Sequence, residues 1–467
     1  MKYIIICILI SGLSHVFAQW ESDVRLTNDP AISATSYGNA WCVAATGDTV
    51  HVVWYDYRDG GSPYGEIYYK RSTDGGATWG ADTRLTIDDS TSHFPSVATS
   101  GAYVHLVWEE TRDGNSEIYH KRSTDGGLIW EADTRLTNDT ASSGNPSLAV
   151  SGSYVHTVWD DTRGGNSDVY YKRSTDGGTI WGADIALTGL HTSGLPSVAV
   201  FGANVHTVWN DGRHGDMEIY YRRSTDNGAT WEPEIRLTNE PSQQTFPCIA
   251  VYGSIIHVVW GDMRDAPNIE IYYKRSIDNG MTWDPDTRLT ISPNSFYPSL
   301  AASGPNVHLT WRDVRGTPRI YYKVSTDSGT TWSPDTALPS ANVIQLYPSI
   351  AASGAIVHVV WWDQRDGPSG NVEVYYKRNP TGNPGVEETV NSKFQISKLN
   401  FCTNPNPFVD YITVRDYEKE VFVVYDVAGE VVGSYRGNRI GSDLVPGIYF
   451  LRLLADDSKL IRVVKVE

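Results

Sequence analysis

The sequence is poor in cysteine. Its 467 residues include four, and they form no pattern that a disulfide framework or a metal site would need. Cys7 lies in the apolar run at the start of the chain, which leaves an odd number, Cys42, Cys248 and Cys402. Cys42 and Cys248 occupy the same position in two distant copies of an internal repeat, where other copies have Ser. We therefore expect each of these two to be a small buried strand residue.

Long apolar runs and an excess of positive charge are also missing. The chain has 38 Lys and Arg against 55 Asp and Glu, a formal net charge of -17, which repels nucleic acid and anionic lipid. One apolar run, Tyr3 to Leu13 after Lys2, leads to Val16-Phe17-Ala18, which predicts a signal peptide over residues 1–18. This run is shorter than the about 20 residues of a membrane span. We expect a secreted or surface-held protein with no integral membrane span and no nucleic-acid partner.

What the sequence does contain is one unit repeated seven times. The motif Val-His-Val-Val-Trp and its variants recur every 50 to 54 residues, with their histidines at His51, His105, His156, His206, His257, His308 and His358. Each unit holds four short β-branched or aromatic segments separated by Gly, Asp, Asn and Pro, which predicts a four-stranded antiparallel meander. Such units are typical of propeller blades. The predicted fold is all-β: a seven-bladed β-propeller over residues 19–379.

The first and last units are incomplete in complementary ways. The outer-strand motif Arg25-Leu26-Thr27 precedes the first complete unit, whereas the seventh unit ends after Tyr375-Tyr376-Lys377-Arg378 without a closing Trp or Arg-Leu-Thr segment. We predict that the N-terminal strand completes the seventh blade and closes the ring, which leaves no open sheet edge.

Six segments match the pattern S-x-D-x-G-x-x-W, and they begin at Ser72, Ser123, Ser174, Ser224, Ser276 and Ser325. This pattern resembles the Asp-box, or BNR, repeat of the sialidase superfamily of propellers. The resemblance implies hairpin turns between third and fourth strands, built by Asp74, Asp125, Asp176, Asp226, Asp278 and Asp327. The chemistry agrees, because an Asp side chain can accept backbone N–H groups and Gly permits positive φ. We expect these residues to be structural.

The motif Trp-x-Asp-x-Arg supplies the candidate binding residues. It lies between the second and third strands, on the face opposite the Asp-boxes, where propellers usually bind ligands. The candidates are Asp56, Arg58, Glu110, Arg112, Asp161, Arg163, Asp211, Arg213, Asp262, Arg264, Asp313, Arg315, Asp363 and Arg365, with Trp362 as a local break in the repeat. Alternatively, each acid and Arg tie their own loop through charge-assisted hydrogen bonds. The presence of the pair in every unit favours this alternative.

No set of residues points to catalysis, which needs different side chains in different roles at one place. The resemblance implies, for sialidases, an Arg triad, a Tyr/Glu nucleophile pair, an Asp acid and an Arg-Ile-Pro motif. Here Arg25 lies in Val-Arg-Leu-Thr instead, and nearly all Arg, Tyr and Glu residues are repeat positions. The seven His residues, one per blade, would lie too far apart to share a metal ion. We expect no catalytic residue, no metal site and no cofactor.

The repeat stops after Arg378, and residues 380–398 are predicted to form a linker. The motifs Asn404-Pro405-Asn406-Pro407-Phe408, Tyr425-Asp426 with Gly429, and Leu444 to Leu451 then follow in order. Residues 399–467 thereby resemble the C-terminal sorting domain of the type IX secretion system. The resemblance implies a small β-sandwich, the type IX export machinery as a partner, and the outside or surface of a Gram-negative bacterium as the location.

Two functions remain in view from the sequence. The first is a non-catalytic propeller that binds a glycan or protein ligand through loops on the face opposite the Asp-boxes. The second is an exo-sialidase-type glycoside hydrolase with a non-standard active site. The symmetry of the repeat favours the binding protein.

Overall fold

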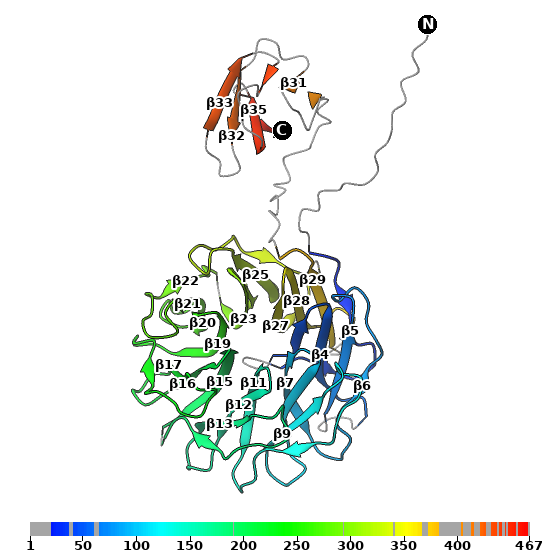
Figure 1. The fold of residues 1–467 in the computed structure, drawn as a ribbon, viewed down its shortest axis with the longest axis vertical. Helices are drawn as coiled ribbons and strands as arrows, with labels where there is room; N and C mark the ends of the chain where they lie inside the picture. The colour runs from blue at the N-terminus through cyan, green and yellow to red at the C-terminus, as the bar shows by residue number, and fades with distance from the viewer. Residues whose placement is uncertain are drawn as a thin grey trace. The chain divides into compact units, whose positions relative to one another are not determined.

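The computed structural model describes residues 20–36, 41–59, 65–189, 191–292, 294–339, 341–366 and 372–382, together with short stretches between 403 and 465. The chain divides into two compact units, Met1–Val386 and Glu387–Glu467. All regular secondary structure of the described residues is β-strand, and seven antiparallel sheets of the first unit stand around one axis (Figure 1). The predicted seven-bladed propeller is confirmed.

Each blade has four strands in sequence order from the axis outward. The innermost strands are β2 (Ser33–Ala34) with β3 (Val43–Thr46), β7 (Ser92–Ser100), β11 (Ser143–Ser151), β15 (Ser193–Phe201), β19 (Gln244–Tyr252), β23 (Ser295–Ser303) and β27 (Gln345–Ser353). The second strands are β4 (Thr49–Asp56), β8 (Tyr103–Glu110), β12 (Tyr154–Asp161), β16 (Asn204–Asp211), β20 (Ile255–Asp262), β24 (Asn306–Asp313) and β28 (Ile356–Asp363).

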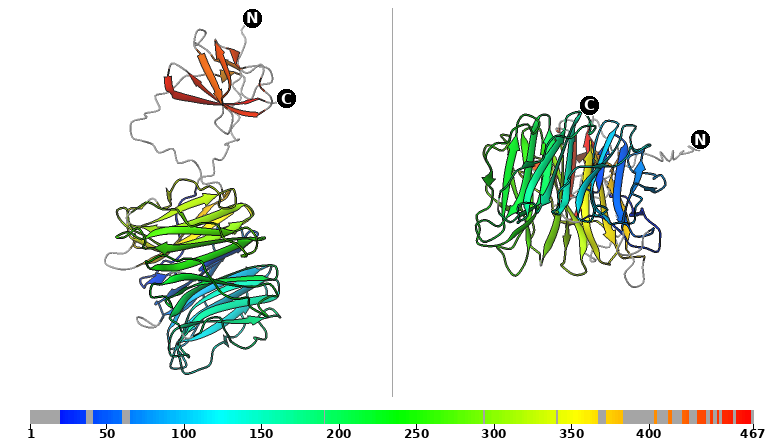
Figure 2. Two further views of the ribbon diagram at one scale, coloured as in Figure 1. Left: turned by 90° about the vertical axis from the view of Figure 1, so that its left-hand side faces the viewer. Right: turned by 90° about the horizontal axis from the view of Figure 1, so that it is seen from below.

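The third strands are β5 (Glu66–Ser72), β9 (Glu117–Ser123), β13 (Asp168–Ser174), β17 (Glu218–Ser224), β21 (Glu270–Ser276), β25 (Arg319–Ser325) and β29 (Glu373–Asn379). The outer strands are β6 (Thr83–Arg84), β10 (Thr134–Arg135), β14 (Ile185–Ala186), β18 (Ile235–Arg236), β22 (Thr287–Arg288), β26 (Thr336–Ala337) and β1 (Val24–Arg25). Figure 2 shows the blades of the ring from the side. We call the face with the loops between second and third strands the upper face, and the opposite one the lower face.

The seventh blade joins the two ends of the propeller, as predicted. Strand β1 pairs antiparallel with β29, so that Val24 faces Tyr376 and Arg25 faces Tyr375. Trp20 supplies the missing Trp of this blade, because its ring lies edge-on to Tyr322 of the preceding blade at 4.8 Å, as Trp79 lies against Tyr376. Ion pairs of Asp23 with Arg365 and Lys377 add to this contact. Strand β1 covers the edge of β29, which would otherwise be open.

The repeated His and Trp residues form the core, as their alternation along the second strand requires. The Trp residues that recur three positions after these His residues, seven in all, are fully buried. In the first blade, His51 Nδ1 lies 2.7 Å from the Tyr69 hydroxyl, and Tyr69 packs edge-on against Trp130 of the next blade. Burial lowers the pKa of His51 to about 4, with Arg71 adding to the effect. These histidines are neutral packing residues that connect neighbouring blades.

The six S-x-D-x-G-x-x-W segments are turns on the lower face. In the first, the Ser72 hydroxyl donates to Asp74 Oδ1 at 2.7 Å, and the same oxygen accepts the Thr78 N–H at 2.9 Å. Hydrogen bonds from Thr78 and Ser72 hold the pKa of Asp74 well below its usual range. In the second turn, Gly127 has φ 83° and an added Cβ would lie 2.0 Å from the Tyr69 hydroxyl oxygen, so this position accepts no side chain.

Cys42 and Cys248 are buried free thiols on the innermost strands, as predicted, whereas Cys402 lies outside the described residues. Burial raises the pKa of Cys42 to about 11 and that of Cys248 to about 12, so both remain thiols at neutral pH.

The second unit contains two antiparallel sheets. One joins β30 (Thr403–Asn404), β31 (Ile412–Val414) and β34 (Arg439–Ile440). The other has the order β33 (Val431–Arg436), β32 (Val421–Tyr425), β35 (Gly447–Leu453) and β36 (Asp456–Lys465). Two small sheets agree with the predicted β-sandwich. The predicted signal peptide and most of the predicted linker lie outside the described residues, and no helix in the described part of the chain could span a membrane.

Closure of the ring predicts an unusual sensitivity at the N-terminus. Deleting residues 19–30 removes β1 and Trp20 and exposes the edge of β29, and Trp20→Ala alone should lower the free energy of unfolding by roughly 3 kcal/mol. Thermal and chemical unfolding of the purified protein measures both effects. The control is Ile129→Ala, whose side chain is 72% exposed and should change stability by less than about 0.5 kcal/mol. A deletion variant that melts like the parent contradicts the closure.

Candidate functional site

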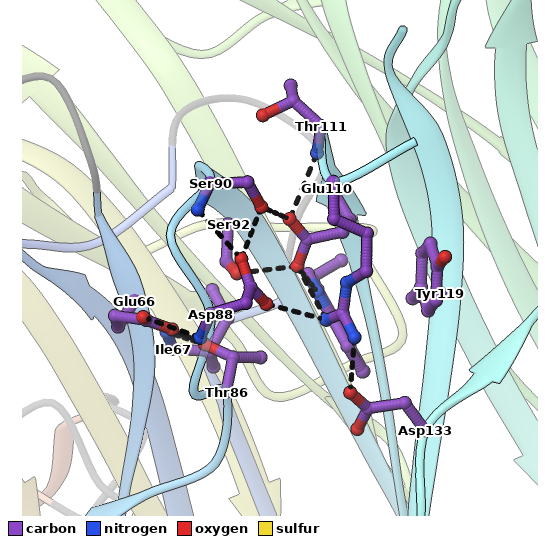
Figure 3. Close-up of polar contacts among 12 residues, drawn as sticks. Glu66, Ile67, Thr86, Asp88, Ser90, Ser92, Glu110, Thr111, Tyr119 and Asp133 are labelled. Carbon is purple, nitrogen blue, oxygen red and sulfur yellow. Dashed lines mark hydrogen bonds and ion pairs between the residues drawn. The ribbon is translucent and has the colours of Figure 1, made fainter. Parts of the chain in front are cut away.

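In each blade the predicted acid and Arg of the upper face are hydrogen-bonded to each other, and we call this contact the tie. Figure 3 shows the tie of the second blade. Glu110 is fully buried and accepts hydrogen bonds from Trp108 Nε1 at 3.1 Å and Arg112 Nη2 at 2.8 Å. Arg112 also contacts Asp88 and Asp133, each at 3.0 Å. Burial raises the pKa of Glu110, but these hydrogen bonds and those from Ser residues outweigh it, so the pKa is lowered and the carboxylate stays ionised.

The other six pairs have the same geometry. Their acids, Asp56, Asp161, Asp211, Asp262, Asp313 and Asp363, are fully buried and each accepts a hydrogen bond from the Trp two residues earlier. Their partners, Arg58, Arg163, Arg213, Arg264, Arg315 and Arg365, lie 4.1 to 4.4 Å above a Tyr ring of the third strand. These contacts tie the loops together; ligand binding by the fourteen residues stays a prediction.

A different ring of residues carries the asymmetry of the upper face. The variable residue of each Trp-x-Asp-x-Arg motif points to the other side of its strand from the buried acid. From the first blade to the seventh these residues are Tyr55, Glu109, Asp160, Asn210, Gly261, Arg312 and Trp362. Trp362 is the one that the sequence had singled out as a candidate. Equivalent places in the seven blades thus hold chemically different groups: a phenol ring, two carboxylates, an amide, a hydrogen atom, a guanidinium and an indole.

A second ring lies beside the first, at the upper ends of the innermost strands. In each of the second to seventh blades a β-bulge there holds one non-glycine residue at φ between 48° and 52°, directly before a Pro: Phe94, Asn145, Leu195, Phe246, Tyr297 and Tyr347. Bulges re-aim side chains, and a left-handed backbone at a non-glycine residue is uncommon. We call these six residues and the seven variable residues together the rim, because they surround the upper end of the central channel.

Aromatic side chains gather on the rim of the fifth to seventh blades. The ring centroids of Phe246 and Tyr297 are 4.7 Å apart, those of Tyr297 and Tyr347 4.9 Å, and those of Tyr347 and Trp362 6.3 Å. All four residues are partly exposed. Arg312 lies 5.4 Å from the centre of the Phe296 ring beside this row. We call Phe246, Tyr297, Tyr347 and Trp362 the aromatic row.

Four polar residues, Glu109, Asn145, Asp160 and Asn210, lie on the rim of the second to fourth blades, together with Phe94 and Leu195. Asn145 Nδ2 donates to Asp160 Oδ2 at 2.8 Å, and the Asn145 backbone N–H bonds to Glu109. Burial raises the pKa of Asp160 to about 7, although bonds from Asn145 and Leu195 oppose this, and burial also raises the pKa of Glu109. Neither carboxylate forms an ion pair with any described residue. Glu109 and Asp160 therefore differ from the acids of the ties, each of which forms an ion pair with an Arg.

A His–Tyr contact lies between the first and second blades. Tyr57 Oη is 3.3 Å from His93 Nε2, and His93 packs edge-on against Tyr55 at 5.3 Å. Burial lowers the pKa of His93, although Glu110 opposes this, and burial raises the pKa of Tyr57. Both groups are therefore neutral at neutral pH. Among the described residues, no group of three metal-ligating side chains lies together here or elsewhere.

The central channel below the rim is narrow and apolar. Its cavity of about 210 Å³ is lined by Ala, Val and Leu side chains, with Trp41 and Thr99 as the exceptions. Ser147, Ser197 and Ser299 each accept a backbone N–H of the next innermost strand through their hydroxyl groups at 3.2 to 3.3 Å, which connects the strands around the channel. The channel offers few hydrogen-bonding groups to a polar ligand.

Sequence reasoning missed most of the rim. A signal was present, because the residue between the Trp and the acid of each motif changes its chemistry from unit to unit, although the residue between the acid and the Arg does so as well. The acid and Arg that recur in every unit were predicted as the candidates, and the residue between the Trp and the acid was not, except for Trp362. The bulge residues carried no comparable signal, since a residue before Pro favours extended backbone.

No protein-family model matches the sequence, and no curated protein matches it. Solved structures match in fold. An ulvan lyase of polysaccharide lyase family PL25 is 12% identical with a TM-score of 0.52, over 74% of this chain and 94% of that one. The phage phi92 endosialidase is 9% identical (TM-score 0.48; 96% and 88% covered), and the Hadza microbial sialidase Hz136 is 15% identical (0.44; 69% and 74%). These structural neighbours are of the sialidase and polysaccharide lyase class, and at such identities the similarity is one of fold.

The unpaired carboxylate on the rim predicts a pH-dependent stability. The folded-state pKa of Asp160, about 7, lies above the value of about 4 for an exposed Asp. Ionisation of Asp160 therefore destabilises the folded protein as the pH rises from about 4 to 7. We expect Asp160→Asn to melt at a higher temperature than the parent at pH 8, and the difference to vanish near pH 4.

The neighbouring residue gives a matched control of opposite sign. Hydrogen bonds from Arg163 and Trp159 overcome the effect of burial and lower the pKa of Asp161. Its ionised form stabilises the fold, so Asp161→Asn should melt at a lower temperature than the parent at pH 8. Thermal unfolding at several pH values measures both. An Asp160→Asn variant no more stable than the parent at pH 8 contradicts the assignment.

Proposed function

We propose that this protein is a non-catalytic glycan-binding propeller whose ligand contacts the rim of the upper face. The observation that carries the proposal is the contrast between two sets of residues. The cores and ties are nearly identical in all seven blades and the lower turns in six, whereas the rim residues differ from blade to blade and most of them, though not Asn210 and Gly261, are partly exposed. A specific ligand needs such a set of different groups at one place.

The chemistry of the rim suits a sugar better than a flat protein surface. The aromatic row offers ring faces and edges to the C–H groups of a pyranose, and the Glu109, Asp160 and Arg312 side chains can exchange hydrogen bonds with its hydroxyl groups. A structural neighbour also supports a glycan as the ligand, although only through its fold: the ulvan lyase was solved with a glucuronate–sulfated rhamnose chain bound.

Export to the cell surface completes the proposal. Residues 1–18 serve as signal peptide, residues 19–379 as the propeller, residues 380–398 as linker, and residues 399–467 as a sorting domain for the type IX export machinery. The motif order in the last segment supports this route, and the net charge of -17 suits a protein that avoids nucleic acid and anionic lipid. The protein then meets its glycan outside the cell.

Substitution of the rim tests the binding. On an array of plant, algal and bacterial glycans, the mature chain should bind a defined subset, and Trp362→Ala should weaken binding about tenfold or more, as expected for a lost aromatic contact. The matched control is Phe201→Ala, which removes a 41% exposed ring at the lower end of β15. Equal binding by the two variants, or no binding by the parent, contradicts the proposal.

A second candidate function is glycoside hydrolysis of the exo-sialidase type at a non-standard site. The observation that favours it is the Glu109–Asp160 pair, because a carboxyl with a pKa of about 7 is suited to act as general acid beside a second carboxyl. A fluorogenic sialic acid glycoside separates the two functions. The binding protein should release no fluorophore; release that Asp160→Asn abolishes would establish the hydrolase instead.

A further inference from the structure

The aromatic row extends along the rim instead of surrounding a pocket. Phe246, Tyr297 and Tyr347 occupy the same bulge position in three consecutive blades, and Trp362 follows beside Tyr347. Their centroids are separated by 4.7, 4.9 and 6.3 Å, and neighbouring ring planes are inclined by 61°, 67° and 59°. The row therefore offers aromatic faces and edges at several consecutive positions.

The row is also held in place before any ligand arrives. Each of its three bulge residues precedes a Pro and has φ between 50° and 52°, which fixes the direction of the side chain. The hydroxyl groups of Tyr297 and Tyr347 are hydrogen-bonded to each other. Such preorganisation reduces the entropy that binding must overcome. Phe94, Asn145 and Leu195 adopt the same backbone, so the bulge belongs to the fold, and the row is the place where three consecutive blades carry an aromatic residue there.

The channel beneath the rim does not suit a sugar that enters end-on. Its cavity of about 210 Å³ has alkyl side chains over most of its lining, and Thr99 carries its one side-chain hydroxyl group; the other polar groups belong to Trp41 and the backbone. Few side chains there can replace the hydrogen bonds that a sugar unit makes with water. The rim, with its polar and aromatic side chains, therefore suits the ligand better.

Charge narrows the class of chain further. The protein carries a net charge of -17, and Glu109 and Asp160 face the rim without a cationic partner among the described residues. The net charge of the protein and the ionised fraction of these two carboxyl groups oppose a strongly anionic chain. Arg312 can donate to hydroxyl groups as well as to anions.

From these observations we infer that the ligand is an internal stretch of a neutral, extended polysaccharide, several consecutive units of which lie along the aromatic row. This inference rests on the proposed glycan binding and specifies its ligand: a chain segment instead of the terminal sugar that an exo-acting site would take.

Calorimetry with the mature chain tests the inference. The probes are soluble β-glucan, xylan and mannan as neutral chains, polygalacturonate and polysialic acid as anionic chains, and the oligosaccharides of the best binder from one to six units. We expect a neutral chain to bind best at physiological salt, and affinity to rise about tenfold for each added unit that reaches a further ring of the row.

Variants at the end of the row connect the length dependence to the structure. Phe246→Ala should reduce the gain in affinity with chain length, whereas Phe246→Trp should retain it. Phe201→Ala on the lower face should match the parent throughout. A melting temperature equal to that of the parent shows that each variant is folded.

The outcomes separate this inference from the proposed function. Binding of a single sugar unit as tight as that of the hexasaccharide, or tighter binding of an anionic chain, overturns the inference and leaves glycan binding intact. A gain with length that Phe246→Ala leaves unchanged also overturns it. Failure of every neutral and anionic glycan to bind overturns the proposed function and the inference together.

Discussion

The pairing of β1 with β29 is the contact on which the rest of the propeller depends. Each blade packs against two neighbours, so a ring that fails to close leaves two blades with an uncovered face. The seam is correspondingly strong. Arg25 and Thr27 bond to the buried Glu373, and Asp23 pairs with both Arg365 and Lys377. The N-terminal segment thus supplies to the last blade the same outer strand, tryptophan and carboxylate that the other six blades obtain from their own sequence.

The architecture was predictable because the repeat is long and regular, and because its residues have strong preferences for β-strands or for turns. The spacing of His51 and its six equivalents gave the number of blades, and the displaced Arg25-Leu26-Thr27 motif gave the closure. Burial of Cys42 and Cys248 followed from the comparison of repeat copies. Each of these inferences compares one copy of the unit with another, so errors in one segment are corrected by the other six.

The rim was less predictable for two physical reasons. The positive φ at Phe94 and its equivalents arises from the bulge geometry of the strand end, and the residue before Pro gives no local indication of it. The bond of the Asn145 backbone N–H to Glu109 joins neighbouring blades through the curvature of the ring, which the sequence does not specify. Departures from the repeat at Glu109 and Trp362 were visible, but their common location on the rim required the structure. The regular parts of the molecule therefore identify the fold, and the irregular residues identify the site.

The division of the last blade between the two ends of the chain also bears on how such a protein changes over evolutionary time. Duplication or loss of a whole internal unit would alter the number of blades and leave both halves of the seam at the termini. Single substitutions on the rim leave the seam, the ties and the lower turns unaffected. The number of blades and the ligand preference can therefore change separately, because they depend on different residues of the same repeat.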